Sequence, residues 1–171
     1  MKRIFIMLTG LLLPFGLAIA QKYALVDTEY ILNHIPNYKS AQTQLDKFSE
    51  EWQKEIEGKY TEIDKMYKDY QAERVLLSED MRKQREDMIV NKEKEAKELQ
   101  KSYFGQEGAL FKKRQELIQP IQDDIYKAIK DLATENGYAV IFDSSSGATM
   151  VYTNPRYDIS DDVLQKLGYK N

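Results

Sequence analysis

The sequence predicts a predominantly helical α+β protein, in which a long antiparallel helical hairpin extends from a small body that contains β-strands. Three observations lead to this fold class. Apolar side chains recur at helical spacing through residues 37–135, which contain one proline. A helix-start signal interrupts that stretch at Ser78. Short strand-like runs occur only at residues 22–27 and beyond residue 137.

The apolar residues of the long stretch repeat every eleven positions. The series are Ala41, Trp52 and Ile63; Leu45, Ile56 and Tyr67; and Leu99, Leu110, Ile121 and Leu132. An eleven-residue repeat corresponds to about 3.67 residues per turn, so the apolar stripe runs nearly straight along a helix. Residues 37–119 are therefore expected to form a helical arm with its tip near residues 76–80.

A tight turn is expected where Ser78 precedes two acidic residues. Serine is a favoured N-cap, and acidic side chains in the first turn stabilise the positive end of the helix dipole. We expect one helix to end near Leu77 and the next to start near Glu79. Antiparallel pairing about this turn places Trp52 beside Tyr103 and brings apolar residues together along the whole arm.

Two glycines and a proline lie in the returning helix. Gly105 and Gly108 each weaken a helix interior by roughly 1 kcal/mol relative to alanine. They indicate either close local packing or a bend in the arm, and the sequence does not separate these readings. Pro120 is predicted to kink the helix where the arm rejoins the body.

Residues 1–20 have the pattern of a secretory signal peptide. Lys2 and Arg3 precede an apolar run, and Ala18 and Ala20 supply the small residues of a cleavage site after Ala20. The chain lacks cysteine, so it has neither a cysteine for lipid attachment nor a disulfide. An exported protein without cysteine points to a bacterial envelope compartment rather than to a eukaryotic secreted protein.

The body is expected to comprise residues 21–36 and 120–171. Residues 22–27 are predicted to form a strand, followed by a short helix that Thr28 caps and that ends at Asn33. Residues 138–142 and 148–153 are predicted to pair as a β-hairpin around a turn at 143–147. Ser160 is expected to cap a last short helix over residues 163–167.

A body of three short strands and two short helices is expected to be too small to bury a core of its own. The strand at 138–142 is apolar on both faces, so we expect sister chains to cover it by sharing one sheet. The residues assigned to this shared body are Tyr23, Leu25, Val26, Tyr138, Val140, Ile141, Phe142, Met150, Val151 and Tyr152.

The mature chain is acidic. Removing residues 1–20 leaves 23 basic and 28 acidic side chains, a net charge of −5, which argues against nucleic acid or anionic lipid as the main partner. No enzyme activity, cofactor or metal site is predicted. The single histidine, His34, is expected at a helix end, and the serines at 144–146 lack a lysine or base at the spacing that phosphate binding or nucleophilic catalysis needs.

Several motifs, in this order, resemble the Skp/OmpH family of periplasmic chaperones across essentially the whole mature length. They are YALVDTEYIL at 23–32, LLSED at 76–80, IQPIQ at 118–122, ATENGYAVIFD at 133–143 and DISDDV at 158–163. The resemblance implies a homotrimer whose strands form one small barrel, with three helical tentacles around a cavity. It also implies a holdase that binds unfolded outer-membrane proteins without ATP.

Client contact would then fall on scattered apolar residues of the distal arm. The candidates are Met66, Tyr70, Met81, Met88 and Val90, with Val75, Leu76 and Leu77 at the tip. Methionine and tyrosine side chains adapt to varied partners. The hairpin seam is an equally good place for Met66 and Met88.

Two further expectations concern the partners. The best-known members of the family are strongly basic, whereas this chain is acidic, so weak or no direct membrane binding is expected. An exported coiled-coil spacer or envelope assembly adaptor without chaperone activity explains the helices and the export equally well. That alternative stays open at the level of the sequence.

Overall fold

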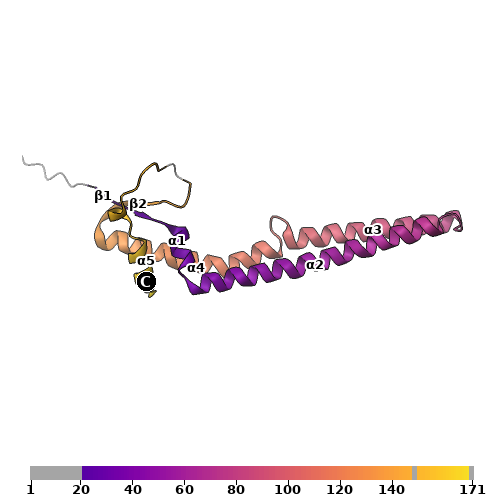
Figure 1. The fold of residues 1–171 in the computed structure, drawn as a ribbon, viewed down its shortest axis with the longest axis horizontal. Helices are drawn as coiled ribbons and strands as arrows, with labels where there is room; N and C mark the ends of the chain where they lie inside the picture. The colour runs from indigo at the N-terminus through magenta and orange to yellow at the C-terminus, as the bar shows by residue number, and fades with distance from the viewer. Residues whose placement is uncertain (1–20, 148–149, 170–171) are drawn as a thin grey trace, which may run out of the picture.

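The computed structural model describes residues 21–147 and 150–169, and it shows a small body with one long arm (Figure 1). In chain order the elements are β1 (Lys22–Val26), α1 (Thr28–Asn33), α2 (Pro36–Glu73), α3 (Glu79–Phe104), α4 (Ala109–Asn136), β2 (Tyr138–Asp143), the 3₁₀ helix η1 (Pro155–Tyr157) and α5 (Ser160–Lys166). The predicted fold class is confirmed. The predicted signal peptide, residues 1–20, lies outside the described residues.

Helix α2 runs outward from the body, and α3 returns along it. Pro36 occupies the start of α2, where the missing N–H of proline costs no hydrogen bond. The 38 residues of α2 span about 57 Å at 1.5 Å per residue. Ser78 caps α3 as predicted, and its hydroxyl accepts a hydrogen bond from the Met81 N–H at 3.4 Å. Within the described ranges, no helix combines the length and the apolar character needed to cross a membrane.

The seam between α2 and the returning helices follows the predicted pairing. The rings of Trp52 and Tyr103 stack with centroids 4.8 Å apart and planes 7° apart, which confirms that contact. Two separate apolar clusters flank the stack: Ile63, Ile89 and Ala96 toward the tip, and Ala41, Leu45 and Ile118 toward the body. The aromatic stack thus lies between two otherwise separate seams.

The connection between α3 and α4 is a short loop that stands out from the arm in Figure 1. Its two glycines end one helix and begin the next, instead of bending a continuous helix. A Cβ on Gly105 would lie 2.3 Å from the carbonyl oxygen of Lys101, and one on Gly108 would lie 2.7 Å from that of Tyr103. Both backbones are extended, so close approach and not a left-handed conformation requires glycine here.

Helix α4 carries the chain from the arm into the body. Pro120 lies inside it, and α4 nevertheless remains one helix from Ala109 to Asn136. The expected boundary between residues 119 and 120 therefore falls within a continuous element. Gly137 ends α4 in the left-handed conformation, with φ of 70°, as the Asn-Gly pair predicts.

The sheet has two parallel strands, β1 and β2. The predicted β-hairpin between 138–142 and 148–153 is wrong for the part that the structure describes, because residues 150–153 form no strand; residues 148 and 149 lie outside the description. The physical reason lies at the end of β2. The Ser144 N–H donates to the Val26 carbonyl at 2.8 Å, so the parallel pairing with β1 continues past Asp143 into the segment where the hairpin turn was expected.

One face of the sheet packs on a core within the single chain. The buried residues are Ala24, Val26, Ile31, Ile35, Ile125, Ala128, Ile159, Val163 and Leu164, with Tyr138 and Ile141 packed against them. The expectation that the body buries no core of its own is therefore wrong. Its error was to leave out α4, which extends into the body and contributes Ile125 and Ala128.

Two predicted helix caps are shifted by one residue. Asp27, not Thr28, caps α1, and its carboxylate accepts the Tyr30 N–H at 2.9 Å. Ile159 occupies the N-cap of α5, so Ser160 is the first helical residue. The Ser160 hydroxyl instead accepts the Asp27 N–H at 2.8 Å, which fastens α5 to the corner between β1 and α1. His34 lies at the end of α1, as predicted.

Candidate interaction surfaces

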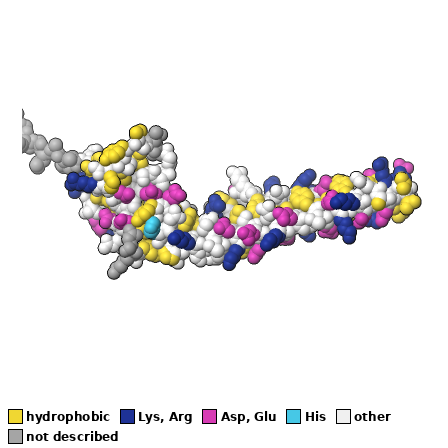
Figure 2. Space-filling model, in the orientation of Figure 1, with side chains coloured by type: hydrophobic (Ala, Val, Ile, Leu, Met, Phe, Trp, Pro, Cys, Tyr) yellow, Lys and Arg dark blue, Asp and Glu magenta, His cyan; other side chains and the backbone are white. Residues whose placement is uncertain are grey.

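The tip of the arm exposes aliphatic side chains to solvent. Val75 is 83% exposed and Leu76 is 84% exposed, while Leu77 is half-buried. Two hydrogen bonds to backbone carbonyls stabilise the turn. The Arg82 guanidinium donates to the Leu77 carbonyl at 3.2 Å, and the Leu76 N–H donates to the Glu73 carbonyl at 2.8 Å. Figure 2 shows hydrophobic side chains at this far end, among charged ones. The tip is therefore an ordered turn that presents a small apolar surface.

The remaining arm candidates divide between the seam and the surface. Met66 and Tyr70 pack against the cluster of Ile63, Ile89 and Ala96, so they belong mainly to the seam. Met81, Met88 and Val90 are about half exposed. Of the two methionines that suited the seam equally well, Met66 lies in it and Met88 does not.

The exposed candidates on α3 lie on opposite flanks of the seam. Ile89 faces α2 and is 2% exposed. At about 100° per residue, Met88 and Val90 point to the two sides of Ile89. Met81 precedes Met88 by seven residues, so the two methionines lie within roughly 20° of each other on one flank.

Tyrosine–glutamate hydrogen bonds cross the arm, and sequence reasoning did not find them. Tyr67 donates to Glu93 at 3.0 Å, Tyr103 donates to Glu55 at 2.8 Å, and Tyr70 donates to Glu86. The hydrogen bond to the glutamate raises the pKa of each tyrosine hydroxyl above its ordinary value. These bonds join α2 to α3 and help to fix the register that the apolar seam sets.

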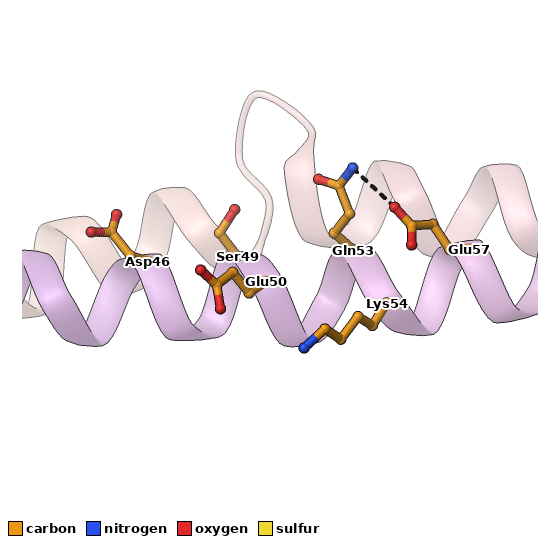
Figure 3. A pocket seen from close by; sticks show the side chains of 6 residues that line it. All are labelled: Asp46, Ser49, Glu50, Gln53, Lys54 and Glu57. Carbon is orange, nitrogen blue, oxygen red and sulfur yellow. Dashed lines mark hydrogen bonds between the residues drawn. The ribbon is translucent and has the colours of Figure 1, made fainter.

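The outer face of α2 is polar. A shallow hollow of about 470 Å³ there is lined by Asp46, Ser49, Glu50, Gln53, Lys54 and Glu57 (Figure 3). These residues follow one another along one helix, and the contact drawn between them joins Gln53 to Glu57 at 3.4 Å. The arrangement is a solvated helix face.

The second face of the sheet is apolar and open. Tyr23, Val140 and Phe142 are each about half exposed, and Tyr23 stacks on Tyr157 with ring centroids 4.9 Å apart. A hollow of about 450 Å³ lies over this face. It is lined by Tyr23, Leu25, Phe142, Met150, Tyr152, Thr153, Asn154 and Tyr157.

The ten residues assigned to a shared body thus belong to two faces. Val26, Tyr138 and Ile141 pack within the single chain, so the assignment of these three to a subunit interface is not supported by their position. The other seven lie on or beside the open face: Tyr23, Leu25, Val140, Phe142, Met150, Val151 and Tyr152. Tyr157 also belongs to this face, and alternation along a strand could not have found it because it lies in η1.

Asp143 fastens the end of β2 to α1. Its carboxylate accepts the Thr28 hydroxyl at 2.7 Å and the Thr28 N–H at 3.2 Å. It also accepts the Ser145 N–H at 3.0 Å and the Ser145 hydroxyl at 2.8 Å. Partial burial alone would raise the pKa of Asp143, but these hydrogen bonds from Thr28 and Ser145 outweigh it and lower the pKa.

The fold and these surfaces define an arm-bearing protein that presents apolar patches, on a helical tip and on an open sheet face. Among residues 21–147 and 150–169, no three histidine, cysteine or acidic side chains gather in a way that could hold a metal ion.

Known proteins share both the sequence pattern and the fold. The family described as "Outer membrane protein (OmpH-like)" matches residues 22–167. The chain is 27% identical to the chaperone protein Skp of Yersinia enterocolitica over 156 residues, covering 86% of this chain and 87% of Skp. It is 28% identical over 167 residues to an uncharacterized protein of Aquifex aeolicus, covering 98% and 96%.

A solved structure shows the same architecture. An OmpH-like protein of Caulobacter crescentus CB15 superposes with a TM-score of 0.67 at 15% identity, over 86% of this chain and 84% of that one. The chain therefore belongs to the OmpH-like outer membrane protein family, and the resemblance to the Skp/OmpH family is confirmed.

We predict that Asp143→Asn destabilises the body by about 1–2 kcal/mol at pH 7, because a charged acceptor of several hydrogen bonds is lost. A lowered folded-state pKa stabilises the fold above the unfolded-state pKa, near 3.8, and this contribution is lost as pH falls through the folded value. The difference between wild type and variant should therefore shrink toward pH 3. Urea unfolding at pH 7 and pH 3 measures it.

Asp124→Asn is the matched control, because Asp124 is exposed on α4. It should change stability by less than about 0.5 kcal/mol at either pH. A destabilisation by Asp143→Asn that is equal at both pH values would contradict the assigned role of the charge.

Proposed function

We propose that the chain is an ATP-independent periplasmic holdase, which binds unfolded outer-membrane β-barrel proteins between helical arms and prevents their aggregation. The observation that carries this proposal is the apolar tip, where Val75 and Leu76 are the most exposed large hydrophobic residues of the described arm. A soluble chain has no structural need for two adjacent, more than 80% exposed aliphatic residues. Membership in the family that includes Skp supports the same role.

The energetics of the exposed residues suit a holdase. An unfolded barrel protein exposes alternating apolar residues over long strands. Burial at about 25 cal/mol per Å² gives only about 1 kcal/mol for partial cover of a valine, leucine or methionine. Several such contacts within one enclosure raise the effective concentration of the client without any single tight grip. This permits retention and release without ATP.

The enclosure requires more than one chain. We propose that the open sheet face, with Tyr23, Val140 and Phe142, is covered by sister chains in a homotrimer. A two-stranded sheet with one uncovered apolar face is a marginal structure in water, and a shared barrel removes both the exposed face and the strand edges. Three arms would then project from one body.

The compartment follows from the same role. We propose export by the segment 1–20, with cleavage after Ala20, and residence in the periplasm. The net charge of −5 of the mature chain favours weak or no direct attraction to anionic membranes. No enzyme activity, cofactor or nucleic-acid partner belongs to the proposal.

Holdase activity is tested by light scattering. An unfolded outer-membrane barrel protein is diluted from urea with and without a threefold molar excess of the mature chain. We expect the turbidity to be largely suppressed. The double variant Val75→Ser/Leu76→Ser should weaken client affinity about thirtyfold, since each of the two lost contacts is worth about 1 kcal/mol.

Tyr126→Ser provides the control, because Tyr126 is 69% exposed but lies on α4 within the body. It should suppress turbidity as well as wild type does. Unchanged turbidity with the wild-type chain would reject the holdase and favour a structural spacer or adaptor. Full activity of the tip variant would show that clients contact another part of the arm.

The shared body is tested by charge placed on the open face. Phe142→Asp should convert the assembly into monomers in sedimentation velocity, since a carboxylate at a dry interface costs several kcal/mol. Tyr126→Asp, on the exposed side of α4, should leave the sedimentation coefficient unchanged. Identical sedimentation of wild type and Phe142→Asp would show that the interface lies elsewhere.

A further inference from the structure

The methionines of the chain differ strongly in access. Of the six methionines, Met1 and Met7 lie in the predicted signal segment. Met66 packs into the seam, and Met150 lines the hollow over the open sheet face. Met81 is 51% exposed and Met88 is 46% exposed, and they share one flank of α3 near the tip. Two thioethers are thus exposed on the arm and two are sheltered.

We propose that Met81 and Met88 are a reversible oxidation site that sets how strongly the arm holds its clients. The proposal rests on the proposed holdase function for its consequence, but the site itself is defined by geometry alone. The oxidant class is a two-electron oxygen donor, such as hydrogen peroxide, and the modified product is methionine sulfoxide.

The composition of the chain directs a peroxide to these residues. With no cysteine in the whole sequence, no thiolate competes for the oxidant. The thioether sulfur attacks one oxygen of the peroxide, an S–O bond forms and the O–O bond breaks. Sulfur loses two electrons, the peroxide is reduced, and the second oxygen leaves as water after proton transfer. Exposure then decides which methionines react first.

Oxidation makes the surface more polar, which weakens client binding and favours release of the client. A thioether is a flexible apolar group that packs on varied partners, whereas a sulfoxide is polar and strongly hydrated. Because Met81 and Met88 lie about two helical turns apart on the same flank, one client segment lying along α3 would meet both. Covering two sulfoxides removes two weak apolar contacts and adds the cost of desolvating two polar groups.

The fold tolerates this change because neither side chain supports the seam. The seam residue next to Met88 is Ile89, which is 2% exposed and belongs to the buried cluster with Ile63 and Ala96. Met81 and Met88 belong to none of the three buried clusters of the described chain. Oxidation at these positions therefore leaves the arm folded, whereas oxidation of Met66 would place a polar group in the seam.

The test uses the mature full-length chain and graded hydrogen peroxide. Peptide mass spectrometry follows the addition of one oxygen at each methionine, and circular dichroism follows the helices. Met81 and Met88 should be oxidised several-fold faster than Met66 and Met150, with no loss of helix signal. At that stage, client affinity from light scattering should fall at least fivefold, and methionine sulfoxide reductases for both epimers, supplied with a dithiol as the electron donor, should restore it.

The variant Met81→Leu/Met88→Leu should hold clients normally and keep that affinity after the same treatment, while Met66→Leu should respond as wild type does. Faster oxidation of Met66 or Met150 would overturn the site. If the double leucine variant lost as much affinity on oxidation as wild type does, the claim that oxidation of Met81 and Met88 weakens client binding would be overturned. Failure of the proposed function is recognised separately, because the untreated wild-type chain would then leave turbidity unchanged, and the release claim would fall with it.

Discussion

The structure depends on the two faces of a two-stranded parallel sheet. The chain can cover one of them, because α4 continues from the arm into the body and packs Ile125 and Ala128 against one face of the sheet. Among the described residues, no other helix or strand covers the second face, where Tyr23, Val140 and Phe142 are each about half exposed. The same helix thus builds the core of the body and extends into the arm, so the direction of the arm is tied to the orientation of the sheet.

The arm has a different requirement, because it must stay rigid while it exposes apolar side chains. Its seam buries small and aliphatic residues, the Trp52–Tyr103 stack lies between two clusters, and tyrosine–glutamate hydrogen bonds add a fixed register. Because the seam does not need the tip or Met81 and Met88, these are free to contact something else. The proposed function and the proposed oxidation site both rest on that division.

Helical periodicity predicted the arm well because period and burial are local properties. The Ser78 cap and the end of α4 at Asn136-Gly137 followed from neighbouring residues, and the Trp52–Tyr103 contact followed from counting back along both helices from the turn. The body was predicted less well, because its sheet pairs β1 with a strand more than a hundred residues away. No local signal told whether residues 138–142 would pair with β1 or with 148–153, and none placed α4 beneath the sheet. The sequence likewise could not tell that Met66 lies in the seam while Met88 is exposed, because that difference depends on the facing helix.

The central claim is that the uncovered sheet face is completed by sister chains, and native mass spectrometry of the mature wild-type chain tests it most directly. The account predicts a dominant species with the mass of three chains at micromolar concentration, which dissociates only on extended dilution. A folded, stable species with the mass of one chain under the same conditions would contradict it.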